Sequence, residues 1–229
     1  MKNYKCCFQN FNIFSWLSIL LSGLLCGAFF ISGCSQTRTV QAPVSIPLGI
    51  KKVLVVSFTD ARGGKNNSSV RCPLSGKTYI TGEIAPGGID FLNNHMRTLL
   101  SNNKGFKFIS SKHLKKIQAD QKYLSEIRLL ADTGKKLKAD AVLTGHIYRY
   151  KDRVGGKFSV KSPASVAFDI HLIRVADGRL LWSAHFDETQ KALTDDLFQL
   201  SSFLERDGQW ITADQMAAKG LEHLTEALK

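Results

Sequence analysis

Residues 164–189, ASVAFDIHLIRVADGRLLWSAHFDET, decide the fold because they read as two long strands joined by one tight turn. Apolar and polar side chains alternate on both sides of Ala176-Asp177-Gly178-Arg179, and a period of two is typical of strands with one buried face. A type I turn with Gly178 in the left-handed region would set Val175 beside Arg179. The apolar residues that this register places on one face are Phe168, Ile170 and Leu172, opposite Phe186, Ala184 and Trp182.

The other face of the predicted hairpin is polar. It carries Asp169, His171, Ser183 and His185, with Asp169 directly across from His185. A carboxylate among imidazoles suits a metal or acid–base site, so a metal-dependent hydrolase using Asp169, His171 and His185 is one alternative. Alternating polar residues on the solvated side of an antiparallel sheet give the same pattern, and we favour that interpretation. We therefore expect no metal, no cofactor and no enzymatic activity.

The segments before the hairpin predict a β-α-β-α-β order. The β-branched run Lys52 to Phe58 is typical of a buried strand, and residues 89–102 place apolar side chains on one face of a helix that Gly105 ends. A short strand (106–110), helical residues 111–137 and a third strand (139–147) follow. We expect an α/β (α+β) single domain with a mixed sheet of about five strands flanked by helices. Its helical tail, 195–229, includes a helix begun by Thr212 with Gln215 three residues later, a capping box.

A loop of about thirty residues, 59–88, is rich in Gly, Ser and Asn. Such a loop is long for a compact domain, so we expect it to be functional or mobile. It contains Ser75-Gly76-Lys77-Thr78, which looks like the end of a phosphate-binding loop. However, Arg71 stands where that loop requires its first glycine, Pro73 removes a backbone donor, and no helix follows. We therefore expect no nucleotide binding.

The N-terminus reads as a targeting segment. Lys2 and Lys5 precede an apolar run from about residue 13 to residue 30. At its end, Ile31-Ser32-Gly33-Cys34 resembles the lipobox of bacterial lipoproteins. That resemblance implies a signal peptide (1–33), cleavage between Gly33 and Cys34, acyl chains on Cys34, and a lipidated tether (34–49) before the domain (50–229). A plain membrane-anchor helix is the alternative, because the run approaches the roughly 20 residues that a span needs.

The compartment follows from this lipobox. Ser35, and not aspartate, follows the cysteine, which in enterobacterial lipoproteins implies the outer membrane, so the domain should face the periplasm. Cys6, Cys7 and Cys26 would leave with the signal peptide. Cys72 would then be the only thiol of the mature chain, which allows no internal disulfide, and we expect it to be buried.

The charge of the chain is strongly asymmetric. The net charge is +12, or +10 without Lys2 and Lys5. Residues 104–138 carry ten basic and three acidic side chains, whereas residues 195–229 carry seven acidic and three basic ones. An exported lipoprotein rarely meets nucleic acid, so the candidate ligands are an acidic protein, peptidoglycan or anionic lipid; the alternative is a solvated helix face. The lysines that we expect to contact a partner are Lys112, Lys115, Lys116, Lys135 and Lys136.

The third predicted strand offers a further candidate surface. His146, Tyr148 and Tyr150 alternate with Ile147 and Arg149, so a strictly alternating strand places them on one face. Such an aromatic face can bind sugar rings or a protein partner. Tyrosines on the solvent side of a strand would look the same.

The strand motifs together carry a family resemblance. Residues 52–58, the run Ala139-Asp140-Ala141-Val142-Leu143-Thr144-Gly145-His146-Ile147, and residues 168–183 look like a periplasmic α/β domain. That domain is shared by the curli secretion-channel lipoprotein and the lipoprotein activators of penicillin-binding proteins. The resemblance implies a mixed sheet flanked by helices and used for protein contacts. It predicts an interaction or regulatory module in envelope assembly, with an oligomeric export component as the alternative if 59–88 forms a membrane hairpin.

Overall fold

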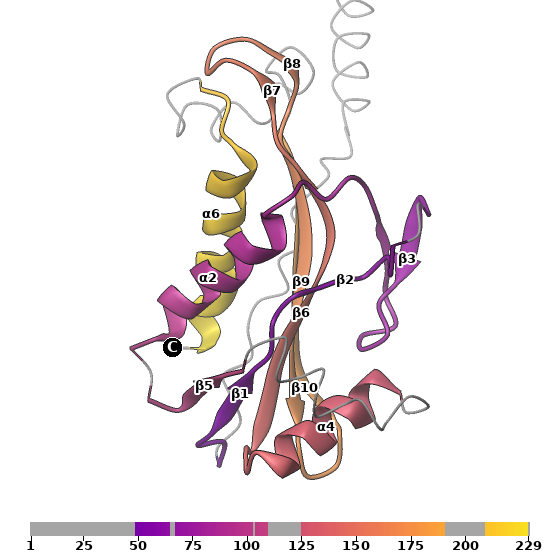
Figure 1. Ribbon diagram of the computed structural model, residues 1–229, viewed down its shortest axis with the longest axis vertical. Helices are drawn as coiled ribbons and strands as arrows, with labels where there is room; N and C mark the ends of the chain where they lie inside the picture. Colours follow the sequence, from indigo (N-terminus) through magenta and orange to yellow (C-terminus); the bar gives the residue numbers. More distant parts are fainter. Residues whose placement is uncertain (1–48, 65–66, 103, 110–124, 191–208, 229) are drawn as a thin grey trace, which may run out of the picture. The chain divides into compact units, whose positions relative to one another are not determined.

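The computed structural model describes residues 49–64, 67–102, 104–109, 125–190 and 209–228. Within these residues a mixed β-sheet carries helices α2 and α6 on one face, and a β-hairpin with helix α4 on the other (Figure 1). None of the helices in the described residues is long and apolar enough to span a membrane. The predicted signal peptide, its cleavage site and Cys34 lie outside the described residues.

The sheet has six strands and confirms the expected fold class. Its main order is β10-β9-β6-β1-β5, and the short β2 pairs with β6. β1 lies parallel to β5 and β6, whereas β9 runs antiparallel to β6 and β10. The strand bounds are Val53–Val55 (β1), Thr59–Asp60 (β2), Phe106–Phe108 (β5), Ala141–Lys151 (β6), Ser165–Arg174 (β9) and Leu180–Thr189 (β10).

The β9–β10 hairpin has the register that its alternation predicts. Phe168, Ile170 and Leu172 pair with Phe186, Ala184 and Trp182, and Asp169 pairs with His185. Gly178 has φ 71°, the left-handed conformation that the turn requires. Only the end of the hairpin differs from the expectation. A register shift between Leu180 and Trp182 pairs Leu180 with Ile173, and the backbone N–H of Arg174 donates to the carbonyl of Arg179.

One face of the sheet packs against α2 (Gly88–Leu100), α6 (Ala213–Thr225) and the short 3-10 helix η3 (Glu226–Leu228). The predicted capping box at the start of α6 is present, because the side chains of Thr212 and Gln215 exchange hydrogen bonds with each other's backbone N–H. An apolar stripe on this side is buried, formed by Ala217, Leu221 and Leu224 of α6 and continued by Leu228 of η3. The first part of the predicted helical tail, residues 195–208, lies outside the described residues.

The opposite face is covered by the segment 59–88 and by α4 (Glu126–Lys136). The segment forms β2 and then a hairpin of β3 (Ser69–Arg71) and β4 (Thr78–Ile80). Its turn, residues 72–77, joins two antiparallel strands, so it lacks the strand–helix junction of a phosphate-binding loop. A second small hairpin, β7 (Val154–Gly155) with β8 (Val160–Ser162), precedes β9.

A register irregularity in β6 changes which face its aromatic residues occupy. Ile147 pairs with Phe168, but Arg149 pairs with Ala167, so one extra residue is accommodated at Tyr148. Tyr148 therefore packs under the β3–β4 hairpin, whereas Tyr150 packs on the α2 and α6 side. The expectation that Tyr148 and Tyr150 share one aromatic face was wrong, because the bulge interrupts the alternation of side chains between the two faces of the strand.

Candidate functional site

The polar face of the β9–β10 hairpin is buried along β9 and half-buried along β10, which corrects the expectation that it faces solvent. Asp169 and His171 are both 0% exposed. The cover is the β3–β4 hairpin, whose Cys72, Leu74 and Tyr79 pack on this face of the sheet. Cys72 is buried, as predicted. The segment 59–88 thus folds over the sheet and encloses a polar cluster.

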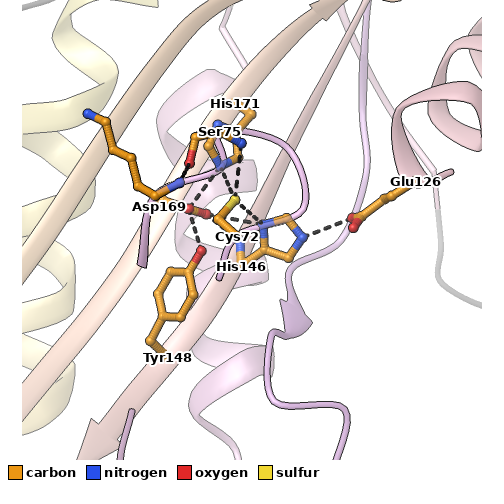
Figure 2. A network of polar contacts seen from close by, with 8 residues as sticks. Cys72, Ser75, Glu126, His146, Tyr148, Asp169 and His171 are labelled. Carbon is orange, nitrogen blue, oxygen red and sulfur yellow. Dashed lines mark hydrogen bonds and ion pairs between the residues drawn. The ribbon is translucent and has the colours of Figure 1, made fainter. Parts of the chain in front are cut away.

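Four side chains form this cluster: Cys72 from the hairpin turn, His146 from β6, and Asp169 and His171 from β9 (Figure 2). The sulfur of Cys72 lies 3.4 Å from Nε2 of His171 and 3.9 Å from Nδ1 of His146. The two carboxylate oxygens of Asp169 lie 2.8 Å from His171 Nε2 and 3.2 Å from His146 Nδ1. One potential ligand atom from each residue lies within 4.8 Å of the others.

Strand pairing explains why these residues meet. His146 is the cross-strand partner of Asp169, and its backbone N–H donates to Oδ1 of that carboxylate at 3.1 Å. His171 stands two residues farther along β9, on the same face because strand side chains alternate. Gly145 lets the strands and Phe58 approach, because a Cβ at this position would lie 2.6 Å from the backbone oxygen of Asp169.

A further set of contacts orients the cluster. Glu126, in the first turn of α4, places Oε1 2.9 Å from Nε2 of His146. The Tyr148 hydroxyl donates to Oδ2 of Asp169 at 2.5 Å. In the hairpin turn, the backbone N–H of Ser75 donates to the sulfur of Cys72 at 3.4 Å. Nδ1 of His171 has no hydrogen-bond partner among the described residues.

The electrostatics of the cluster favour a thiolate and a carboxylate facing two imidazoles. Burial raises the pKa of the Cys72 thiol, but hydrogen bonds with His146 and His171 outweigh burial and lower this pKa to about 5. Burial also opposes ionisation of Asp169, yet the same two histidines hold its pKa below the usual range. Burial lowers the pKa of His146, but Asp169, Cys72 and Glu126 raise it to about 12. The pKa of His171 is raised in the same way by Asp169 and Cys72, against burial.

This arrangement supplies one sulfur, two imidazole nitrogens and one carboxylate as donors to a common centre. These are the donor types that bind zinc in proteins. A nucleophilic role for Cys72 would require a substrate to reach the sulfur, but the residue is only 1% exposed. The geometry therefore suits a bound ion better than catalysis on a substrate.

The sequence identified part of this cluster and missed the rest. Asp169 and His171 were candidates, but Ser183 and His185 do not join them among the potential ligands. The ring of His185 stacks on Tyr79 instead, with 4.1 Å between ring centroids. Cys72 and His146 were not expected as partners of Asp169. They reach it through the pairing of β6 with β9 and the packing of the β3–β4 hairpin on the sheet, and neither contact produces a pattern in the local sequence.

The two tyrosines proposed for partner binding do not form a surface in this structure. Tyr148 is 0% and Tyr150 3% exposed. The Tyr148 hydroxyl donates a hydrogen bond to Asp169, and the Tyr150 hydroxyl donates one to Asp214 at the start of α6. Burial and the nearby carboxylates raise the pKa of both tyrosines well above the usual value.

A basic cleft lies at the end of the sheet where the parallel strands β1, β5 and β6 begin. Its volume is about 200 Å³, and four of its nine lining residues are lysines, with no acidic residue among the nine. The lining residues are Lys52, Val53, Leu54, Lys104, Gly105, Lys107, Leu137, Lys138 and Ala139. Lys135 and Lys136, two of the predicted contact residues, are exposed in the last turn of α4 beside this cleft. Lys112, Lys115 and Lys116 lie outside the described residues.

Lys138 occupies an unusual backbone conformation. Its φ is 54°, and it is the only non-glycine residue with positive φ in the described part of the chain. The N–H of Lys138 donates to the carbonyl of Lys135, and the N–H of Ala139 donates to that of Gly134, a Schellman motif. Glycine is the residue preferred at this position, so a lysine here costs about 1 kcal/mol.

No protein-family model matches the chain, and no curated protein matches it in sequence. Several solved structures have a similar fold. The PelC dodecamer from Paraburkholderia phytofirmans is 15% identical with a TM-score of 0.48, and the match covers 84% of this chain and 96% of that one. The LpoB C-terminal domain from Escherichia coli is 18% identical with a TM-score of 0.37, covering 64% and 88%. Lipoprotein GNA1162 from Neisseria meningitidis is 15% identical with a TM-score of 0.37, covering 68% and 96%.

These similarities concern the fold. LpoB is a penicillin-binding-protein activator lipoprotein, so the similar structures include the group that the sequence resemblance names. All three TM-scores are below 0.5 and all three identities are below 20%. The comparison therefore assigns neither a family nor an activity to this chain.

Proposed function

We propose that this protein is a lipid-anchored, periplasm-facing interaction module of the outer membrane that binds an acidic protein partner through the basic cleft. The observation that carries the proposal is the cleft itself, because four lysines converge on a space of about 200 Å³ whose lining has no acidic side chain. Like charges repel when they are brought together, so such a cluster favours a partner that neutralises it. The role is one of binding and regulation, and not of turnover.

The sequence supports the proposed location. The Ser32-Gly33-Cys34 motif at the end of an apolar run is the acceptor that lipoprotein processing requires. Several acyl chains, at about 0.8 kcal/mol per buried methylene, hold a domain stably on a bilayer surface. The tether 34–49 would then set how far the basic cleft reaches into the periplasm.

Charge reversal tests the binding surface. Full-length protein carrying Lys107→Glu and Lys138→Glu is compared with Lys161→Glu and Lys219→Glu, which changes the net charge equally at exposed positions outside the cleft. Crosslinking in intact envelopes followed by pull-down should recover the same acidic protein with the native chain and the control, and lose it with the cleft variant. Equal recovery from all three chains, or recovery of peptidoglycan in place of a protein, would contradict the proposal.

The alternative of an oligomeric export component makes a different prediction. A ring of many copies would elute from gel filtration, after detergent extraction, far ahead of a monomer, because the whole precursor chain has a mass of only 25.4 kDa. The interaction module should elute near the size of one chain with its detergent. The same extract, treated with the crosslinker, distinguishes contacts between copies from contacts with another protein.

A further inference from the structure

The geometry points to a metal site: we propose that Cys72, His146, Asp169 and His171 together bind one zinc ion. This proposal does not depend on the proposed function, because the cluster lies under the β3–β4 hairpin and not in the basic cleft. The alternation in the sequence favours a solvated polar face at Asp169 and His171, but both side chains are completely buried.

The spacing of the donor atoms is close to that of tetrahedral coordination for the sulfur and the two histidine nitrogens. Zinc bond lengths of roughly 2.0–2.3 Å place a sulfur and a nitrogen about 3.5 Å apart, and a nitrogen and an oxygen about 3.4 Å apart. The sulfur of Cys72 lies 3.4 Å and 3.9 Å from the histidine nitrogens. The oxygens of Asp169 lie 2.8 Å and 3.2 Å from the same nitrogens. Since one donor atom from each of the four residues lies within 4.8 Å of the others, the cluster would contract around a bound ion.

Contacts around three of the four ligands prepare them for an ion. Because Glu126 accepts from Nε2–H of His146, the lone pair of Nδ1 is directed at the cluster, the carboxylate–histidine arrangement common behind zinc ligands. The N–H of Ser75 stabilises negative charge on the Cys72 sulfur. The Tyr148 hydroxyl fixes the Asp169 carboxylate. A neighbouring group thus holds the ligand atom of each of Cys72, His146 and Asp169 in place.

The charge and the donor types select zinc among the divalent ions. One thiolate and one carboxylate with two neutral imidazoles carry two negative charges, which a divalent ion neutralises inside an apolar environment. Binding displaces the protons that the ligands hold in the metal-free protein, so that both imidazoles become neutral, and these protons go to solvent. Calcium and magnesium require oxygen ligands, whereas sulfur with imidazole suits zinc; the carboxylate disfavours a copper centre of the His₂Cys type.

The site is closed, which indicates a structural ion. All four residues are buried, with exposures of 1% for Cys72, 2% for His146 and 0% for Asp169 and His171. Four protein ligands leave no open position for a substrate. The ion would join the hairpin turn at residue 72 to the two central strands, so zinc would hold the segment 59–88 over the sheet.

Zinc binding by the full-length protein in detergent tests this proposal. Chelator-treated protein is loaded with Zn²⁺ or Co²⁺, and metal is measured by native mass spectrometry and absorption spectroscopy. We expect one zinc per chain, and for Co²⁺ the intense d–d bands of tetrahedral geometry with a sulfur-to-cobalt charge-transfer band. The band should disappear in Cys72→Ser, while the exposed histidine control, His223→Gln, should match the native chain.

Either the mass spectrometry or the absorption spectrum can contradict the proposal. Absence of stoichiometric zinc, preference for copper over zinc, or a native Co²⁺ spectrum without the sulfur band would overturn the proposal. Circular dichroism establishes that each variant is folded. If Cys72→Ser does not fold, the native Co²⁺ spectrum decides. Cys72 is the only cysteine in the described residues, and it would be the only free thiol of the mature, lipidated chain used in the measurement.

Glu126 provides a matched second test as a positioning residue. Its carboxylate orients His146 without reaching the ion, so Glu126→Gln should weaken zinc binding by about 10- to 100-fold and keep the sulfur band. The control is Asp132→Asn on the same helix, whose carboxylate forms an ion pair with the exposed Lys135. Equal zinc affinity in the two variants would contradict a role for Glu126.

Discussion

The sulfur of Cys72 lies 3.4 Å from Nε2 of His171, although the two residues are 99 positions apart in the chain. Cys72 belongs to the turn of the β3–β4 hairpin, and His171 belongs to a central strand of the sheet. The contact therefore fastens a peripheral hairpin to the most buried part of the domain. Apolar packing of Leu74 and Tyr79 surrounds it.

If zinc holds this hairpin, removing it should loosen the hairpin selectively. Chelator should increase tryptic cleavage after Arg71 and Lys77 several-fold, because both residues are exposed and their backbone would open locally. Mass spectrometry of the fragments measures this. Cleavage after Arg179, in the β9–β10 turn, is the internal control and should not change. Equal acceleration at all three sites would indicate general unfolding, and no acceleration would contradict the predicted role of the ion.

The two buried tyrosine hydroxyls should differ in their effect on stability. Tyr148→Phe removes the hydroxyl donor from the buried Oδ2 of Asp169 and leaves this oxygen with His171 alone, which should lower the free energy of unfolding by about 1–3 kcal/mol. Tyr150→Phe removes a hydrogen bond to Asp214, an exposed residue that water can solvate, so its cost should be about 0.5–1.5 kcal/mol. Urea unfolding at equal zinc concentration measures both. A larger loss of free energy of unfolding in Tyr150→Phe than in Tyr148→Phe would contradict this ranking.

Gly145 is required by close packing and not by its backbone conformation. A Cβ there would lie 2.6 Å from the backbone oxygen of Asp169 and would also overlap the Phe58 ring. Gly145→Ala should therefore lower the free energy of unfolding by about 1–3 kcal/mol. Gly156→Ala is the control, since its Cβ would meet only the oxygen of Ser159 at 3.9 Å. Thermal melting separates the two, and similar melting temperatures would show that the strands can move apart at Gly145.

The sequence was sufficient for the hairpin and for the order of the main elements. Alternation around Gly178 predicted the β9–β10 register because an error of one residue would move Phe168 and Ile170 to the wrong face. The capping box at Thr212 is a local signal and was equally readable. These features depend on residues that are close in the chain.

The buried cluster was beyond such local signals. Asp169 and His171 were visible as a polar pair, but an alternating strand looks the same whether its polar side meets water or a covering hairpin. Their burial depends on Cys72, about a hundred residues earlier, and on the choice of β6 as the neighbour of β9. The bulge that separates Tyr148 from Tyr150 likewise has no signature in the residues around it.

Lys138 offers a way to separate stability from partner binding. Its φ of 54° is a conformation that glycine adopts without strain, whereas its side chain lines the basic cleft. Lys138→Gly should therefore raise the free energy of unfolding by about 1 kcal/mol, because the strain at the end of α4 is relieved. The same substitution should weaken capture of an acidic partner, because one of the four cleft lysines is lost.

Two variants control this prediction. Lys138→Ala removes the same charge but keeps a Cβ at positive φ, so it should weaken capture equally without the gain in stability. Lys161→Ala removes an exposed lysine outside the cleft and should change neither quantity. Urea unfolding and crosslinking in intact envelopes are measured on the same preparations. A stabilised Lys138→Gly chain that captures its partner as well as the native protein would show that the lysine is not kept at this position for binding, and the basic cleft would lose its strongest residue-level support.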